Sequence, residues 1–214
     1  MNNKTIFLTG ITGVIVFAAA AVVGGLLIDN YSVTSQYISE TYAIDTEYGW
    51  SLRIFGYIPS GILFTLFCFL GVKYLPSSVW IKTGFYGVGL FYGIGTIIVS
   101  IFPCDSGCNP DYINPSISQM IHNLSALMVY VFVPISILTT GLGLKKFSNY
   151  KKLSLMSIAL GVLSFGFVYM LSSNLESEFA GLYQRIIESL ILVWILAFAF
   201  KIKNTSNKTL HHRF

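Results

Sequence analysis

Long uncharged segments dominate the pattern of apolar and polar positions along the chain. Placing a charged side chain at the centre of a bilayer costs about 2.5–3.5 kcal/mol, and about 20 apolar residues span the hydrocarbon core as a helix. A run of this length without charge therefore predicts a membrane-spanning helix. Five such runs occur, at Thr5 to Ile28, Ile54 to Val72, Thr83 to Cys104, Tyr112 to Leu144 and Leu153 to Leu175.

A sixth segment is apolar but short, because only residues 189–200 separate Glu188 from Lys201. A helix of that length is too short for the bilayer, so we expect it to begin near residue 180 and to carry Arg185 and Glu188 into the membrane. The chain is thus predicted to be all-α, a single domain of residues 1–214. Its six transmembrane helices are expected at about 5–28, 54–74, 81–103, 116–142, 153–173 and 180–201.

The charges predict the orientation of this bundle. All bases except Arg53 and Arg185 lie at the termini or in the two loops on the same side: Lys4, Lys73, Lys82, Lys145, Lys146, Lys151, Lys152, Lys201, Lys203, Lys208 and Arg213. The acids all lie on the other side: Asp29, Glu40, Asp45, Glu47, Asp105, Asp111, Glu176, Glu178 and Glu188. By the positive-inside rule, both termini are cytoplasmic and the acidic loops face outward.

Composition agrees with a protein of the cell membrane. Only 10% of the residues are charged, 54% are hydrophobic, and the mean hydropathy is +0.70. The net charge of +4 does not indicate nucleic-acid binding, because the positive-inside rule already accounts for the bases. The expected surroundings are membrane lipid, with a second copy of the chain or another membrane protein as a possible partner.

Cys104 and Cys108 lie in an outward loop and favour a local disulfide on the oxidising side of the membrane. Zinc usually takes three or four ligands, and His211 and His212 lie on the cytoplasmic side, so no metal site and no cofactor are predicted. Cys68 stands alone within a predicted span and is interpreted as a small apolar packing residue.

Ionisable side chains lie inside two of the predicted spans, away from their ends. His122 is one or two turns into the fourth, and Arg185 and Glu188 are spaced i, i+3 on the sixth, with Gln184 on the same face. Ionisable residues at this depth usually face the interior of a bundle or a wet cavity. Two interpretations stay open: an ion pair and hydrogen bonds that only hold helices together, or a functional cavity.

Four segments in order along the whole chain resemble the six-span bacterial and archaeal family called domain of unknown function 998. They are Tyr31-Ser-Val-Thr-Ser-Gln-Tyr-Ile-Ser-Glu40, Phe102-Pro-Cys-Asp-Ser-Gly-Cys108, His122-Asn123 and Gly181-Leu-Tyr-Gln-Arg185. The resemblance implies a six-helix fold, a bacterial cytoplasmic membrane and an outward polar cluster that includes Ser35 and Glu40, without implying an activity. Val33 stands where the family pattern favours a polar residue, often His, which further weakens a metal site.

Three hypotheses follow. In the first, the protein is a membrane-embedded enzyme acting on a lipid or anionic head group: His122 is the acid or base, Asp105 or Glu188 orients it, and Arg53 and Arg185 hold the anion. In the second, the same cavity, with Gln184, Ser35 and Glu40, binds or transports a lipid or small anion without chemistry. In the third, the protein is a non-catalytic accessory subunit whose polar cluster specifies helix packing.

Overall fold

A computed structural model describes residues 1–175 and 177–205 of the chain. The predicted all-helical fold is confirmed, because the described residues form helices and connecting turns and no strand. Glu176, Lys208, His211, His212 and Arg213 lie outside the described residues.

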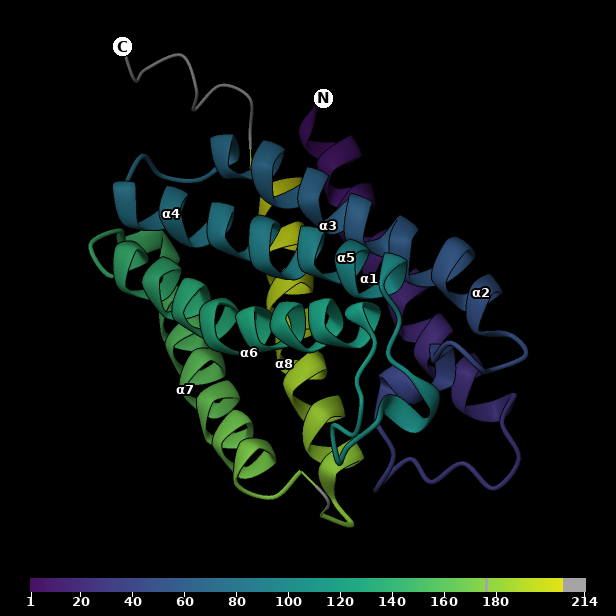
Figure 1. The fold of residues 1–214 in the computed structure, drawn as a ribbon. Coiled ribbons are helices and arrows are strands. Elements are labelled where there is room, and N and C mark those ends of the chain that lie inside the picture. Colours follow the sequence, from purple (N-terminus) through teal and green to yellow (C-terminus); the bar gives the residue numbers. More distant parts are fainter. Residues whose placement is uncertain (176, 206–214) are drawn as a thin grey trace.

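Six continuous helical segments form the bundle (Figure 1). They are α1 (Asn3–Leu26); Gly49–Tyr74, comprising α2 (Gly49–Leu52), η2 (Arg53–Tyr57), α3 (Ile58–Gly71) and η3 (Val72–Tyr74); Val79–Ile101, comprising α4 (Val79–Gly87), η4 (Val88–Ile94) and α5 (Gly95–Ile101); α6 (Ile117–Leu144); η6 (Ser148–Tyr150) followed by α7 (Lys151–Ser173); and α8 (Ala180–Lys203). Two short 3-10 turns, η1 (Ile38–Tyr42) and η5 (Ser106–Cys108), lie in the loops.

The second helical segment begins at Gly49 rather than at residue 54, so Arg53 lies within the helix. Its guanidinium Nε donates a hydrogen bond to the Gly49 carbonyl at 3.2 Å. A charge at a span end can therefore lie inside the helix while its polar head stays near the interface.

Five of these segments, all except α8, are long and apolar enough to cross a membrane. Large apolar side chains remain exposed on their outer faces, among them Leu26, Ile117, Leu155 and Tyr169. In water such a surface would promote aggregation, whereas lipid solvates it. The chain is therefore a multi-pass helical membrane protein. The count of six spans and the side on which the termini lie stay predictions.

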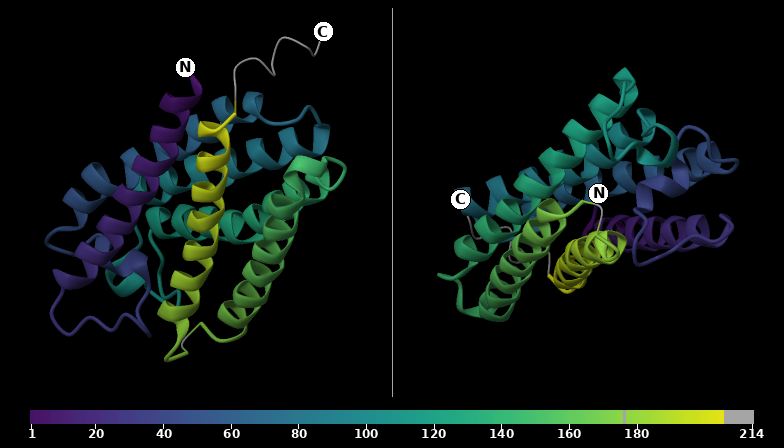
Figure 2. Two further views of the ribbon diagram at one scale, coloured as in Figure 1. Left: turned by 180° about the vertical axis from the view of Figure 1, so that it is seen from behind. Right: turned by 60° about the horizontal axis from the view of Figure 1, so that its bottom comes forward.

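The helices pack in a ring that follows the chain order (Figure 2). The second and third segments and α6 form one layer, and α1, α8 and α7 form the other; α8 closes the ring by packing against both α1 and α7. The side chains of Ile187, Ile191, Trp194, Ile195 and Phe198 on α8 are fully buried in the core. This burial explains how α8 accommodates polar residues, because its neighbours rather than lipid surround much of it.

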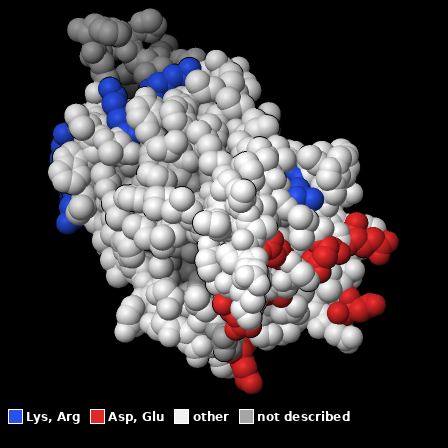
Figure 3. All heavy atoms as spheres, in the orientation of Figure 1, with Lys and Arg blue, Asp and Glu red and all other residues white. Residues whose placement is uncertain are grey.

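Charges separate along the bundle, as Figure 3 shows: bases gather near the end that carries the N-terminus, and acids gather at the opposite end. The side-chain amide of Asn3 donates a hydrogen bond to the Lys203 carbonyl at 3.0 Å, so the beginning of α1 and the end of α8 are neighbours. We call the other end of the bundle the acidic end.

Candidate functional site

At the acidic end, the loop of residues 31–37 crosses the beginning of α8. We call this segment the strap. The first N–H groups of a helix have no intrahelical acceptor, and here the strap supplies two: the N–H of Gly181 donates to the Ser35 carbonyl at 3.3 Å, and that of Leu182 donates to the Thr34 carbonyl at 2.8 Å. A Cβ at position 181 would lie only 2.2 Å from the Gln36 carbonyl oxygen, so glycine permits this close approach.

Arg185 fastens the strap from the next turn of α8. Its guanidinium donates hydrogen bonds to the Gln36 carbonyl at 2.8 Å and to the Tyr31 hydroxyl, and it lies 5.4 Å from the centre of the Tyr31 ring. Within the strap, the Gln36 amide donates to a carboxylate oxygen of Glu40 at 2.9 Å, while the N–H of Tyr37 donates to the other at 2.7 Å. Arg185 and Glu40 therefore stabilise the loop, and neither lines the cavity described below.

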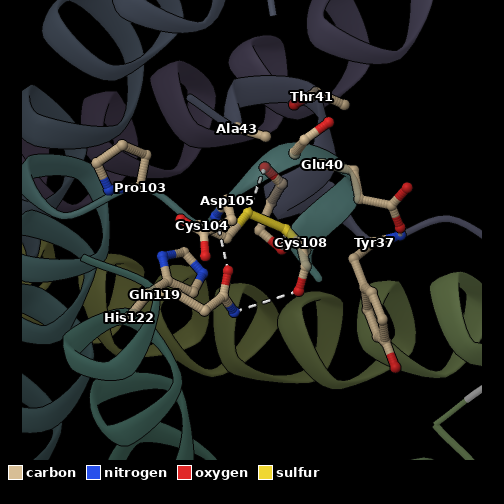
Figure 4. Close-up of a disulfide and its surroundings, with 12 residues drawn as sticks. Tyr37, Glu40, Thr41, Ala43, Pro103, Cys104, Asp105, Cys108, Gln119 and His122 are labelled. Carbon is tan, nitrogen blue, oxygen red and sulfur yellow. Dashed lines mark hydrogen bonds between the residues drawn. A yellow bond between two sulfur atoms is a disulfide. The ribbon is translucent and has the colours of Figure 1, made fainter. Parts of the chain in front are cut away.

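A second loop carries the disulfide between Cys104 and Cys108 (Figure 4). Gln119, which is fully buried near the start of α6, holds this loop in place: its oxygen accepts from the N–H of Asp105 at 2.6 Å, and its amide donates to the Cys108 carbonyl at 3.2 Å. Cys108 Sγ lies 3.2 Å from Ser39 Oγ of η1. The two loops at the acidic end are thus packed against each other.

Asp105 caps the beginning of α6. Its carboxylate accepts the backbone N–H of Ser116 at 3.0 Å and the Ser116 hydroxyl at 2.5 Å. These two hydrogen bonds, the backbone one foremost, hold the pKa of Asp105 below its usual value. This half-buried carboxylate thus bonds to the start of α6, and no hydrogen bond joins it to His122 in the described part of the chain.

A partly open cavity of about 420 Å³ lies beneath these loops, lined by residues of the loops and of helices from both layers. Drug-sized ligands occupy pockets of about 300–1,000 Å³. Its walls are mainly apolar, and among its polar lining residues are His122, Gln184 and Glu188. The structure therefore brings three of the predicted site residues to one cavity.

His122 lines this cavity from α6. Its Nδ1 lies 3.2 Å from the Val99 carbonyl and 3.0 Å from the Phe102 carbonyl. Because carbonyl oxygens only accept, Nδ1 carries the proton, and Nε2 of the neutral ring is left as an acceptor. Main-chain groups rather than a carboxylate orient this imidazole.

Glu188 and Gln184 line the cavity from α8. Tyr92 donates a hydrogen bond to Glu188 Oε2 at 2.7 Å. Gln184 accepts the N–H of Ile38 at 2.6 Å and donates to the Tyr130 hydroxyl at 2.9 Å. The ion pair considered between Arg185 and Glu188 does not form in the described part of the chain, because each has other partners.

Tyrosines are the lining residues that sequence reasoning missed. Tyr57 and Tyr92, both almost completely buried, lie in η2 and η4, two π-helical turns that widen their helices beside the cavity. Among the described residues, the Tyr57 hydroxyl has no hydrogen-bond partner. The sequence did contain a signal for these residues: a tyrosine within a membrane-spanning segment needs a hydrogen-bond partner for its hydroxyl, which indicates a polar site inside the bundle.

Tyr37, the last residue of the strap, lines the cavity. Its hydroxyl donates a hydrogen bond to the Leu175 carbonyl at 2.8 Å, which connects the loop after α7 to the first loop. Burial, followed by the nearby Glu40 carboxylate, raises the pKa of Tyr37 to about 12, so the phenol stays protonated and this bond persists at neutral pH.

The described residues contain no group of three or more His, Cys, Asp or Glu side chains that could hold a metal ion. Arg53, the other predicted anion ligand, bonds to its own helix and does not line the cavity. The geometry thus offers a cavity with an acidic and hydroxyl-rich lining, and it leaves both arginines outside.

Comparison with known proteins identifies the family. Residues 11–201 match the family model described as protein of unknown function (DUF998). No curated protein and no solved structure matches the chain. Because the match covers most of the sequence, the chain belongs to this family, and the resemblance drawn from the four segments is confirmed.

Proposed function

We propose that this member of the DUF998 family binds an amphipathic, lipid-soluble ligand in the cavity at the acidic end of the bundle. The supporting observation is the combination of apolar walls with buried polar groups that converge on one volume. Glu188, Tyr57 and His122 are each at most 8% exposed and all line it. Burying polar groups that helix packing does not require costs free energy, and hydrogen bonds or charge pairs with a ligand would offset this cost.

The proposal includes an orientation. All six helical segments cross the membrane, both termini are cytoplasmic, and the cavity opens toward the outer leaflet. The separation of bases from acids along the bundle supports this arrangement. A green fluorescent protein fused to the C-terminus is then expected to fluoresce. A fusion that inserts into the membrane but does not fluoresce would place the C-terminus on the outer side and contradict the proposed orientation.

Ligand binding is tested by filling the cavity. Ala126 lines it from α6, so an Ala126→Trp substitution would occupy the volume, while Ala19 on the exposed face of α1 offers a matched control. Native mass spectrometry with monoolein, a neutral amphiphile, is expected to give a one-to-one adduct with the wild type and with Ala19→Trp but not with Ala126→Trp. Equal adducts in all three proteins, or none in any, would overturn the proposal.

A second candidate is chemistry on the bound ligand, because His122 and Glu188 line the same cavity and could move a proton. His122 Nε2 is the candidate base, with its ring held by the Val99 and Phe102 carbonyls. A ligand that changes mass over time with the wild type and stays unchanged with His122→Gln would favour an enzyme. A ligand recovered intact from both proteins would favour binding alone.

A further inference from the structure

Among the described residues that line the cavity, Glu188 is the one aspartate, glutamate, lysine or arginine. Glu188 is 8% exposed, and its Oε2 accepts the hydrogen bond from Tyr92. This is the one hydrogen bond that the described residues give to the Glu188 side chain, and the residue lines the cavity. The carboxyl group therefore has capacity to accept further hydrogen bonds or to pair with a charge.

No lysine or arginine side chain lines the cavity beside this acid in the described part of the chain, and His122 directs its Nδ1 to the Val99 and Phe102 carbonyls. Arg185, one turn away on α8, directs its guanidinium to the strap, and Arg53 bonds to Gly49. Neither arginine lines the cavity. A buried carboxylate without a counter-charge is strongly disfavoured, so a positively charged ligand would relieve the cost and an anionic one would increase it.

Aromatic rings surround the same volume. Tyr42 and Tyr57 have ring centroids 4.5 Å apart, and Phe17 lies 5.4 Å from Tyr57 and 6.0 Å from Tyr92. The faces of such rings attract cations, most strongly when water is excluded, and clusters of this kind bind quaternary ammonium groups. The lining rings are Phe17, Tyr37, Tyr42, Tyr57, Tyr92 and Tyr130.

The remaining walls select for an organic cation. Val99, Leu127, Val129, Val168 and Leu171 contribute apolar surface to the cavity. A hydrated metal ion needs several oxygen ligands, whereas this lining offers a single carboxylate among hydrocarbon and aromatic groups. A cation that carries its own apolar substituents fits both features.

We infer that the cavity binds a lipophilic organic cation, of the ammonium or phosphonium class, with Glu188 as its counter-charge and the tyrosine and phenylalanine rings as its cage. This inference rests on the proposed ligand-binding function and replaces the anionic head group expected from the sequence. The sequence expectation depended on Arg53 and Arg185, and the structure keeps both outside the cavity.

Tetraphenylphosphonium and tetraphenylborate test the inference, because they have nearly the same size and shape and opposite charge. Isothermal titration of the full-length protein in a non-ionic detergent, with empty-micelle heats subtracted, measures both affinities. We expect tetraphenylphosphonium to bind at least about tenfold more tightly, equivalent to about 1.4 kcal/mol. Glu188→Gln should lower its affinity by at least the same factor, whereas Glu178→Gln, which changes an exposed acid, should not.

Two further measurements guard against misfolding and separate the two proposals. Glu188→Asp keeps the negative charge, so it should still bind tetraphenylphosphonium more tightly than tetraphenylborate, and Glu188→Gln should retain its monoolein adduct. Equal or tighter binding of tetraphenylborate, or an unchanged affinity in Glu188→Gln, would overturn the cation inference while a monoolein adduct still upheld the cavity. If Glu188→Gln loses both ligands and its melting temperature collapses, Glu188→Asp decides the question: the inference is overturned if that variant does not prefer tetraphenylphosphonium to tetraphenylborate.

Discussion

Replacing Arg185 with alanine is expected to release the strap from α8 without emptying the cavity. The guanidinium connects the helix to two points of the strap, the Gln36 carbonyl and the Tyr31 hydroxyl. Its third bond, to the Gly181 carbonyl at 3.0 Å, stays within α8 and connects nothing else. The substitution therefore removes two cross-links between segments that lie far apart in the sequence.

The expected loss follows from these two bonds. A hydrogen bond from a charged donor contributes about 1.5–3 kcal/mol. Since Arg185 is only partly buried, we use the lower value for each, which gives about 3 kcal/mol. For a chain of this size, that loss lowers the melting temperature by about 6–12 °C.

Thermal unfolding in detergent measures this shift, and limited proteolysis reports on the strap itself. Arg185→Lys keeps the charge but lacks the planar fork that reaches both acceptors, so it should recover about half of the loss. Arg53→Ala is the matched control, because that arginine makes one local hydrogen bond, to Gly49, and its removal should cost about 1.5 kcal/mol or less, half of the loss expected for Arg185→Ala.

The reasoning would be refuted by Arg185→Ala melting within about 2 °C of the wild type while losing its monoolein adduct. That result would make Arg185 a ligand-binding residue, as the sequence alone suggested. A retained adduct with a lowered melting temperature would instead support its role in holding the strap.

Three other substitutions probe the loops at the acidic end. Gly181→Ala would put a Cβ 2.2 Å from a strap carbonyl oxygen and should lower the melting temperature and expose the strap to protease. Changing Cys104 and Cys108 together to serine removes a short covalent loop and should cost about 2 kcal/mol, measured as a lower melting temperature that added reductant no longer changes. Asp105→Asn should lower the melting temperature at neutral pH, because it removes the carboxylate that caps α6 at Ser116. The pKa of Asp105 is lowered in the folded state, so the stabilisation that this carboxylate provides is lost as the pH falls through that pKa. The difference in melting temperature between wild type and Asp105→Asn should therefore narrow toward about pH 3, and a difference that stays constant would contradict the cap.

Most of the helices were predictable because charged residues mark, to within a few positions, where the apolar segments begin and end. Charges end the apolar segments, and an apolar helix needs no knowledge of its neighbours to satisfy its backbone in lipid. α8 was harder, since Arg185 and Glu188 shorten its apolar stretch, and only the length of a bilayer required the helix to start near residue 180. The structure begins it at Ala180.

The partners of the polar side chains were less predictable. An i, i+3 spacing puts Arg185 and Glu188 near each other on a helix, but it does not determine which residues of other segments compete for them. The strap offers Arg185 two acceptors, and Tyr92 offers Glu188 a donor, from segments far away in the sequence. Such long-range partners decide whether a charge belongs to a loop or to a cavity.

Gln184 couples the strap to the cavity, because one amide group serves both. Its oxygen accepts the Ile38 N–H at the end of the strap, and its nitrogen donates to the Tyr130 hydroxyl that lines the cavity. A ligand that donates a hydrogen bond to the Tyr130 hydroxyl therefore competes with the Gln184 amide for this acceptor, and a displaced amide weakens its hydrogen bond from the Ile38 N–H. Gln184→Met, which keeps the size of the side chain without its hydrogen bonds, should lower both protease resistance of the strap and ligand affinity. Arg185→Ala should lower the first alone, so the two variants together distinguish a coupled closure from a strap that only stabilises the fold.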